Sequence, residues 1–215
     1  MTVSSMTRYA YLHGFASSPA SRKGSALSLA FERLQVPLER PDLNTPSFSR
    51  LTATAMLEVL DRMHALAGPG TVWRFIGSSL GGWLAALWAF LHPEAVERLL
   101  LLAPAFAMQR LWPRILGRQV FDEWQRRGEI EMPDARGQHV PVHFGLYEDM
   151  CRYPEAPSVY CPTTIIHGVA DEVVPVEHSR SYTKAHRNVR LIEVPDRHDL
   201  ANSLDLVVAE ACVGV

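Results

Sequence analysis

The chain has 215 residues, of which 47% are hydrophobic and 20% are charged, and its formal net charge is −2. This composition is typical of a single globular domain over residues 1–215, and the near-neutral charge argues against nucleic acid or an anionic membrane as a partner. The three cysteines form no Cys-x-x-Cys pair, which indicates reduced thiols and a cytoplasmic protein. The N-terminus lacks the apolar core of a signal peptide, and no apolar run is long enough to span a membrane.

Short apolar runs recur along the chain, as in buried strands. They occupy residues 9–12, 36–40, 96–102, 163–167 and 189–194, and a further run opens the stretch 72–83. Helical patterns separate most of these runs. Strands that alternate with helices predict a compact α/β fold with a mostly parallel sheet of about six strands and helices on both faces.

Amphipathic helices are expected in several of the connecting segments. Apolar residues repeat at i, i+3, i+4 and i+7 from Leu27, from Met56 and from Leu204, and further helices are expected at residues 80–91 and 176–186. Ser47 or Ser49 can provide the N-cap of the helix that contains Met56. Gly68-Pro69-Gly70 should end that helix.

Residues 105–160 interrupt the alternation. Aromatic and apolar side chains are interleaved with arginines in this segment, and we expect helices followed by irregular or short β structure at residues 137–146. Such a segment can simply cover the edge of the sheet. We favour the alternative of a helical cap over the mouth of a site, in which aromatic residues such as Phe106 and Trp112 contact a substrate.

Gly77-Ser78-Ser79-Leu80-Gly81 matches the Gly-x-Ser-x-Gly pattern of a nucleophile elbow, a sharp turn that joins a strand to a helix. Glycines two positions before and after Ser79 remove the Cβ atoms that would collide in such a turn. Ser78 lacks glycines at both of these positions. A Gly/Ser turn that merely starts a helix gives the same short match, but the preceding apolar strand and the following helix favour Ser79 as a nucleophile.

Polar residues follow the last two predicted strands, where the carboxyl ends of a parallel sheet place functional groups. His198 is the candidate base for Ser79, because imidazole titrates near neutrality. Asp171 is the candidate partner that orients this imidazole, and Glu172 and Asp199 are the alternatives. The order Ser, Asp, His along the chain is the order of an α/β-hydrolase triad.

The loop after the first strand supplies further candidates. The amide N–H groups of Phe15 and Leu80 are expected to form an oxyanion hole, which binds the negative oxygen of the reaction intermediate. His13 should shape this loop and line the substrate site, and its alternative role as the base is the weaker reading. His167, at the end of a strand, is interpreted as structural.

Metal and nucleotide chemistry find no support in the sequence. No His-Glu-x-x-His motif, P-loop or Gly-x-Gly-x-x-Gly motif occurs, so we expect neither a metal ion nor another cofactor.

Asp196 and Asp199, which flank His198, are interpreted as turn or capping groups.

Several of these motifs together resemble the α/β-hydrolase superfamily and, within it, the small YqiA-like bacterial esterases. The motifs are Tyr11-Leu12-His13-Gly14-Phe15-Ala16-Ser17-Ser18-Pro19 with Lys23, Ile76-Gly77-Ser78-Ser79-Leu80-Gly81-Gly82, His167-Gly168 with Asp171, and His198. The resemblance implies the same roles as the residues themselves do: Ser79, Asp171 and His198 for a triad, Phe15 and Leu80 for the oxyanion hole. The chain departs from the superfamily pattern in leaving no room for an N-terminal antiparallel hairpin and in having Arg197 where many relatives have glycine.

We therefore expect a serine hydrolase that cleaves carboxylic esters of small or medium acyl groups through an acyl-serine intermediate. A thioesterase needs the same machinery and is the nearest alternative, while a non-catalytic ligand-binding protein that retains the fold is the alternative from another class. The expected partner is a small-molecule ester or thioester, and the sequence does not determine the oligomeric state.

Overall fold

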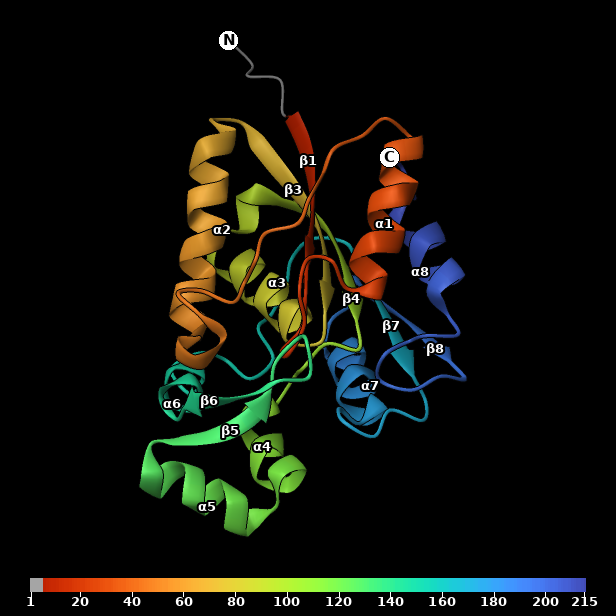
Figure 1. Ribbon diagram of the computed structural model, residues 1–215. Helices are drawn as coiled ribbons and strands as arrows, with labels where there is room; N and C mark the ends of the chain where they lie inside the picture. The colour runs from red at the N-terminus through yellow and green to blue at the C-terminus, as the bar shows by residue number, and fades with distance from the viewer. Residues whose placement is uncertain (1–5) are drawn as a thin grey trace.

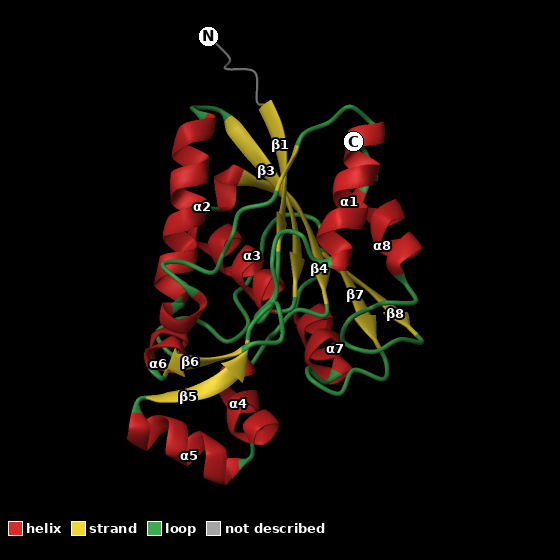
Figure 2. Cartoon of the chain, in the orientation of Figure 1, coloured by secondary structure: helices red, strands yellow, loops and turns green. Residues whose placement is uncertain are grey.

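The computed structural model describes residues 6–215, which form a central parallel sheet flanked by helices (Figures 1 and 2). Its strands are β1 (Met6–Leu12), β2 (Leu38–Glu39), β3 (Thr71–Ser78), β4 (Val96–Leu102), β7 (Thr163–Gly168) and β8 (Val189–Val194). They lie in the order β2-β1-β3-β4-β7-β8, and every neighbouring pair is parallel. The predicted α/β class is confirmed, and all carboxyl ends of the strands meet at one edge of the sheet.

Helices cover both faces of this sheet (Figure 1). On one face lie α1 (Arg22–Arg33) and α8 (Leu204–Ala211), and on the other lie α2 (Ala53–Ala67), α3 (Leu80–Leu91) and α7 (Val176–Ala185). The apolar stripe that starts at Leu27 packs against the sheet through Leu27 and Phe31, both fully buried. Helix α3 is apolar on nearly all sides because other elements enclose it. Within residues 6–215, no helix combines the length and apolar character needed to cross a bilayer.

The start of α2 differs from the prediction. Thr52, rather than Ser47 or Ser49, is the N-cap, and its side chain accepts a hydrogen bond from the amide of Ala55. Ser47 instead precedes a single 3₁₀ turn, Phe48–Arg50, and makes no capping hydrogen bond. Leu51, which lies between this turn and the N-cap in sequence, is buried in the core, so the start of α2 involves tertiary packing as well as local capping.

The segment between β4 and β7 forms a substructure of its own at the carboxyl edge of the sheet (Figure 1). It contains α4 (Met108–Leu116), α5 (Arg118–Arg127), an antiparallel hairpin of β5 (Glu129–Pro133) and β6 (His139–His143), and α6 (Gly145–Met150). Helices and a later short strand were expected here, whereas β5 was not. The hairpin turn is held by Asp134, whose carboxylate accepts hydrogen bonds from the amides of Arg136 and Gln138.

This insertion has an aromatic core and a polar attachment to the rest of the molecule. Trp124 is fully buried among neighbouring aromatic rings and donates a hydrogen bond to the carbonyl oxygen of Val142 at 2.8 Å. The Asp149 carboxylate accepts hydrogen bonds from both the amide (2.7 Å) and the hydroxyl (2.9 Å) of Thr54 in the first turn of α2. The insertion is therefore joined to α2 by charge-assisted hydrogen bonds as well as by the chain.

Candidate active site

Ser79 occupies a strained turn between β3 and α3. Its φ of 53° and ψ of −117° are sparsely populated for a residue with a side chain. The turn depends on close backbone approaches, because a Cβ on Gly77 would lie 2.7 Å from the Cα of Gly82 and one on Gly81 would lie 2.6 Å from the carbonyl carbon of Leu12. The glycines at −2 and +2 are thus required sterically, as the motif predicts.

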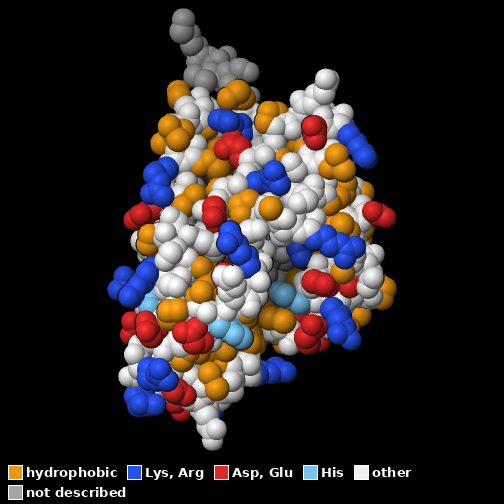
Figure 3. Space-filling model, viewed as in Figure 1, with side chains coloured by type: hydrophobic (Ala, Val, Ile, Leu, Met, Phe, Trp, Pro, Cys, Tyr) orange, Lys and Arg blue, Asp and Glu red, His pale blue; other side chains and the backbone are white. Residues whose placement is uncertain are grey.

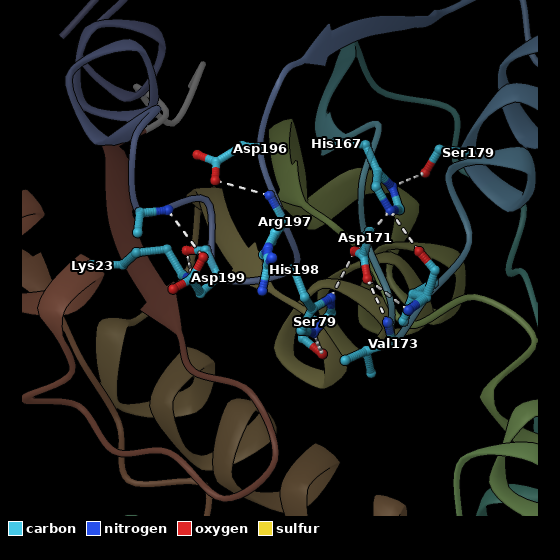
Figure 4. Close-up of polar contacts among 12 residues, drawn as sticks. Lys23, Ser79, His167, Asp171, Val173, Ser179, Asp196, Arg197, His198 and Asp199 are labelled. Atoms are coloured by element: carbon cyan, nitrogen blue, oxygen red, sulfur yellow. Dashed lines mark hydrogen bonds and ion pairs between the residues drawn. The ribbon is translucent and has the colours of Figure 1, made fainter.

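The structure brings Ser79, His198 and Asp171 into one hydrogen-bonded line (Figure 4). The Nε2 atom of His198 lies 2.9 Å from the Ser79 hydroxyl, and its Nδ1 atom lies 2.7 Å from Oδ2 of Asp171. Because the carboxylate can only accept, Nδ1 carries a proton and Nε2 is left to accept one from the hydroxyl. This is the geometry that general-base activation of a serine requires.

The Asp171 carboxylate is fully buried yet well supplied with donors. Its Oδ1 atom accepts hydrogen bonds from the amides of Val173 (2.9 Å) and Val174 (2.8 Å). Burial acts to raise the pKa of Asp171, but hydrogen bonds from His167, His198 and the amide of Val174, with the charge of His198, together hold this pKa well below its ordinary value. Asp171 is therefore ionised at neutral pH.

His167 is a second imidazole beside Asp171, and the sequence analysis assigned it only a structural role. It is fully buried, and its Nε2 atom lies 3.0 Å from Oδ2 of Asp171 and 2.9 Å from the carbonyl oxygen of Val174. Both neighbours are acceptors, so Nε2 carries the proton and Nδ1 accepts from the Ser179 hydroxyl at 2.7 Å. The chain of contacts thus extends from Ser79 through His198 and Asp171 to His167 and Ser179.

The His198 loop is held against the Asp171 loop by another close approach. A Cβ on Gly168 would lie 2.6 Å from the carbonyl oxygen of Arg197, so the pairing of these loops requires glycine there. Asp196 organises the same loop by accepting hydrogen bonds from the amides of Arg197 and Asn202. Asp196 therefore serves as a turn group, and neither it nor Asp199 replaces Asp171 as the partner of His198.

The loop after β1 lies directly over Ser79. A Cβ on Gly14 would be 3.2 Å from the Cβ of Ser79, so a side chain there would require the loop or Ser79 to shift slightly. The amide N–H groups of Phe15 and Leu80 donate no hydrogen bond within residues 6–215. His13 is buried, donates from Nδ1 to the carbonyl oxygen of Gly14 and accepts at Nε2 from the amide of Leu43. These bonds hold the loop after β1 in its conformation.

A pocket of about 220 Å³ opens beside Ser79 and His198. Its walls come from the loop after β1, the start of α1 and the loop that follows His198. Figure 3 shows a histidine and basic side chains around a hollow on this side of the molecule.

Two residues that were predicted to contact substrate do not line this pocket. Phe106 is buried against Tyr182 and lines a separate groove, and Trp112 is buried with its ring edge-to-face against Phe15.

Solved structures of other proteins share this fold. Alpha/beta hydrolase domain-containing protein 10 from mouse superposes with a TM-score of 0.76 at 19% identity, covering 98% of this chain and 89% of that chain. Est1E from Butyrivibrio proteoclasticus, solved with ferulic acid bound, superposes with a TM-score of 0.74 at 20% identity, covering 98% and 88%. The chain has an α/β-hydrolase fold.

Sequence comparisons lead to the family. The chain is 24% identical over 202 residues to monoacylglycerol lipase abhd6-B of Xenopus laevis, and 31% identical over 109 residues to the mitochondrial palmitoyl-protein thioesterase ABHD10 of Mus musculus. These matches cover 92% and 48% of this chain but only 57% and 37% of the relatives' lengths. A family model described as "Uncharacterised protein family (UPF0227)" matches residues 8–207, and the chain belongs to this family. The resemblance to α/β-hydrolases of the YqiA-like type is confirmed.

Proposed function

We propose that this protein is a serine hydrolase that cleaves carboxylic esters of small or medium acyl groups. The observation that carries the proposal is the line of hydrogen bonds from Ser79 through His198 to the buried Asp171, with distances of 2.9 and 2.7 Å. Next to Ser79, the amides of Phe15 and Leu80 donate no hydrogen bond within residues 6–215 and are available to a substrate oxygen. The lipase and thioesterase among the relatives support the same reaction class.

The proposed reaction has two halves. In the first, His198 takes the proton of Ser79 as its oxygen attacks the ester carbonyl, and the amides of Phe15 and Leu80 donate hydrogen bonds to the oxygen that becomes negative. His198 then gives the proton to the departing alcohol, which leaves an acyl group on Ser79. In the second half, His198 activates water to release the acid and restore the serine.

The support around Asp171 fits this reaction. The carboxylate stabilises the imidazolium that forms at His198, and it must remain ionised and correctly oriented to do so. His167 and the two amides on Oδ1 hold the carboxylate in place, so we assign His167 the role of a positioning residue.

Replacement of Ser79 tests the proposal. Ser79→Ala should lower kcat for a short p-nitrophenyl ester by about 10⁴-fold or more, because removal of the nucleophile of such a triad has effects of this size. A fluorophosphonate probe should label the wild-type protein, and peptide mass spectrometry should locate the label on Ser79. Undiminished turnover in the variant, or a label on another residue, would refute the assignment.

A thioesterase is the second candidate, favoured by the 31% identity to a palmitoyl-protein thioesterase over 109 residues. Both reactions use the same nucleophile and oxyanion hole, so the site geometry does not separate them. Values of kcat/KM for oxygen and sulfur esters with the same acyl group should be compared. We expect the oxygen ester to be cleaved efficiently, and turnover confined to sulfur esters would favour the thioesterase.

A further inference from the structure

Two basic side chains line the pocket beside Ser79 and His198. Arg22 and Lys23, the first two residues of α1, form part of its wall together with the loop after β1. The same wall contains one carboxylate, that of Asp199, whose Oδ1 atom accepts a hydrogen bond from the amide of Ala201 at 3.2 Å. The pocket therefore carries an excess of positive charge close to the proposed nucleophile.

The Lys23 ammonium group is incompletely paired. Its Nζ atom donates to the carbonyl oxygen of Asp199 at 2.7 Å (Figure 4), and within residues 6–215 no carboxylate oxygen lies within 4.0 Å of it. An ammonium group has three donors, so this single acceptor leaves two for solvent or a ligand. Burial lowers the pKa of Lys23, while the charges of Asp199, Asp196 and Asp171 act in the opposite direction.

The helix dipole does not favour cations at this position. The first turn of a helix is its positive end, where acidic side chains are favourable and basic ones are not. Helix α1 has no acidic residue in its first turn and begins with Arg22 and Lys23. A basic pair that opposes the helix dipole and lines a cavity indicates a ligand of negative charge.

We propose that the pocket binds a carboxylate group of the substrate, so that the substrates of this hydrolase are small esters that carry a free carboxylate. Lys23 would bind the carboxylate from the inside of the pocket and Arg22 from its exposed rim. Leu200, Ala201 and Leu204 supply an apolar wall for the short carbon chain between the carboxylate and the ester. The volume of about 220 Å³ is below the roughly 300–1,000 Å³ of pockets for drug-sized ligands, which fits a small acid. This proposal depends on the proposed serine hydrolase function.

Lys23 also makes a structural contact whose effect the test must separate from binding. Its bond to the Asp199 carbonyl ties α1 to the loop that carries His198. If this tie were its only role, removing Lys23 would slow turnover of charged and neutral esters alike. If Lys23 binds a carboxylate, its removal changes the ratio between them.

Matched pairs of esters provide that ratio. Mono-p-nitrophenyl glutarate is compared with p-nitrophenyl hexanoate, and 3-carboxyphenyl butyrate with 3-methylphenyl butyrate, so that the carboxylate is placed on the acyl side and on the alcohol side in turn. In at least one pair, wild type should prefer the charged ester by roughly tenfold or more in kcat/KM, the size expected for a hydrogen bond between charged groups. Lys23→Met should abolish the preference and Lys23→Arg should restore part of it.

Lys184→Met is the matched control, because Lys184 is the other lysine of the chain and is exposed on α7, away from the pocket. It should leave the ratio unchanged. Two further measurements test the proposal even if the Lys23 variants fold poorly. Arg22→Gln should lower the ratio, and raising NaCl from about 20 to about 300 mM should lower it in wild type through screening.

The failure of this proposal is distinguishable from failure of the proposed function. If Ser79→Ala does not reduce turnover, the hydrolase assignment itself is wrong. If turnover depends on Ser79 but wild type shows no preference in either pair, the carboxylate subsite is refuted. An equal loss on charged and neutral esters in Lys23→Met also refutes it and leaves Lys23 as a structural tie.

Discussion

The carboxylate of Asp171 is the most constrained charge in the site. Two backbone amides bind one of its oxygens, while the imidazoles of His198 and His167 approach the other. An unpaired buried charge is costly, so this arrangement both orients the carboxylate and makes its ionisation compatible with burial. The proposed catalytic geometry and the local stability of the protein thus depend on the same four contacts.

The stability of the protein should depend on pH through Asp171. A carboxyl group with a pKa lower in the folded than in the unfolded state contributes stability that is fully present above its unfolded pKa, about 3.9, and is lost as the pH falls through the folded pKa. Asp171→Asn should therefore be less stable than wild type near neutral pH, with a difference that shrinks below about pH 4.

Urea unfolding of both proteins between neutral and acidic pH measures this difference. Asp205→Asn, which replaces an exposed carboxylate on α8, is the control for loss of a negative charge alone. A difference between wild type and Asp171→Asn that grows as the pH falls would contradict the assigned sign.

At the scale of elements, the site depends on how closely β1, β3 and α3 approach one another. Gly81, in the first turn of α3, lies against the carbonyl group of Leu12, the last residue of β1. Any larger residue would push α3 away from the loop that carries Phe15. The separation of the two proposed oxyanion donors is therefore set by a contact between main chains.

Gly81→Ala should lower both stability and activity. Overpacking of this kind costs about 1–3 kcal/mol of unfolding free energy, and the displaced loop should reduce kcat more than it raises KM. Gly128→Ala is the comparison, since a Cβ there meets nothing within 4 Å and the cost is limited to its φ of 79°. Its stability should fall by about 1 kcal/mol with kcat unchanged. Equal kcat in the two variants would show that the contact at Gly81 does not control the site.

At the scale of the whole molecule, the insertion between β4 and β7 shares a hydrophobic core with the sheet and its helices, and polar contacts join it to them as well. Asp149 bonds Thr54 at the start of α2, and Trp83 of α3 donates to the carbonyl oxygen of Pro154 at 3.0 Å. Because Asp149 is buried, these bonds are little screened by solvent.

Asp149→Ala should loosen the insertion. The amide of Thr54 loses its partner and its hydroxyl keeps only Tyr153, so we expect a loss of about 2 kcal/mol in unfolding free energy and faster amide exchange in α6. Glu148→Ala removes the adjacent exposed acid on the same helix and should change neither quantity appreciably. Unaltered exchange in Asp149→Ala would mean that aromatic packing alone holds the insertion.

Much of this architecture could be predicted from local sequence patterns. The helix Leu80–Leu91 and the strand Val189–Val194 have the boundaries expected from their apolar runs, because each is bounded by a turn or by charged and polar residues. Ser79, Asp171 and His198 could be selected because each follows a predicted strand, and the carboxyl ends of parallel strands converge.

Other features depend on contacts that no local pattern encodes. The strand β5 has only two apolar positions, Ile130 and Met132, and forms because β6 pairs with it. The contact of His167 with Asp171 requires the turn that follows β7, and its bond to Ser179 requires α7 to pack on that strand. The wall formed by Lys23 becomes part of a pocket only when α1 meets the loop after β8.

The separation of Ser79 and His198 by 119 residues has a consequence for the protein during its synthesis. When a nascent chain has emerged from the ribosome only as far as α3, Ser79 has been made but His198, its proposed base, has not. The proposed reactivity also requires β8 to join the sheet next to β7, because His198 lies in the loop after β8. Synthesis as far as His198 would therefore have to precede the onset of the proposed ester cleavage.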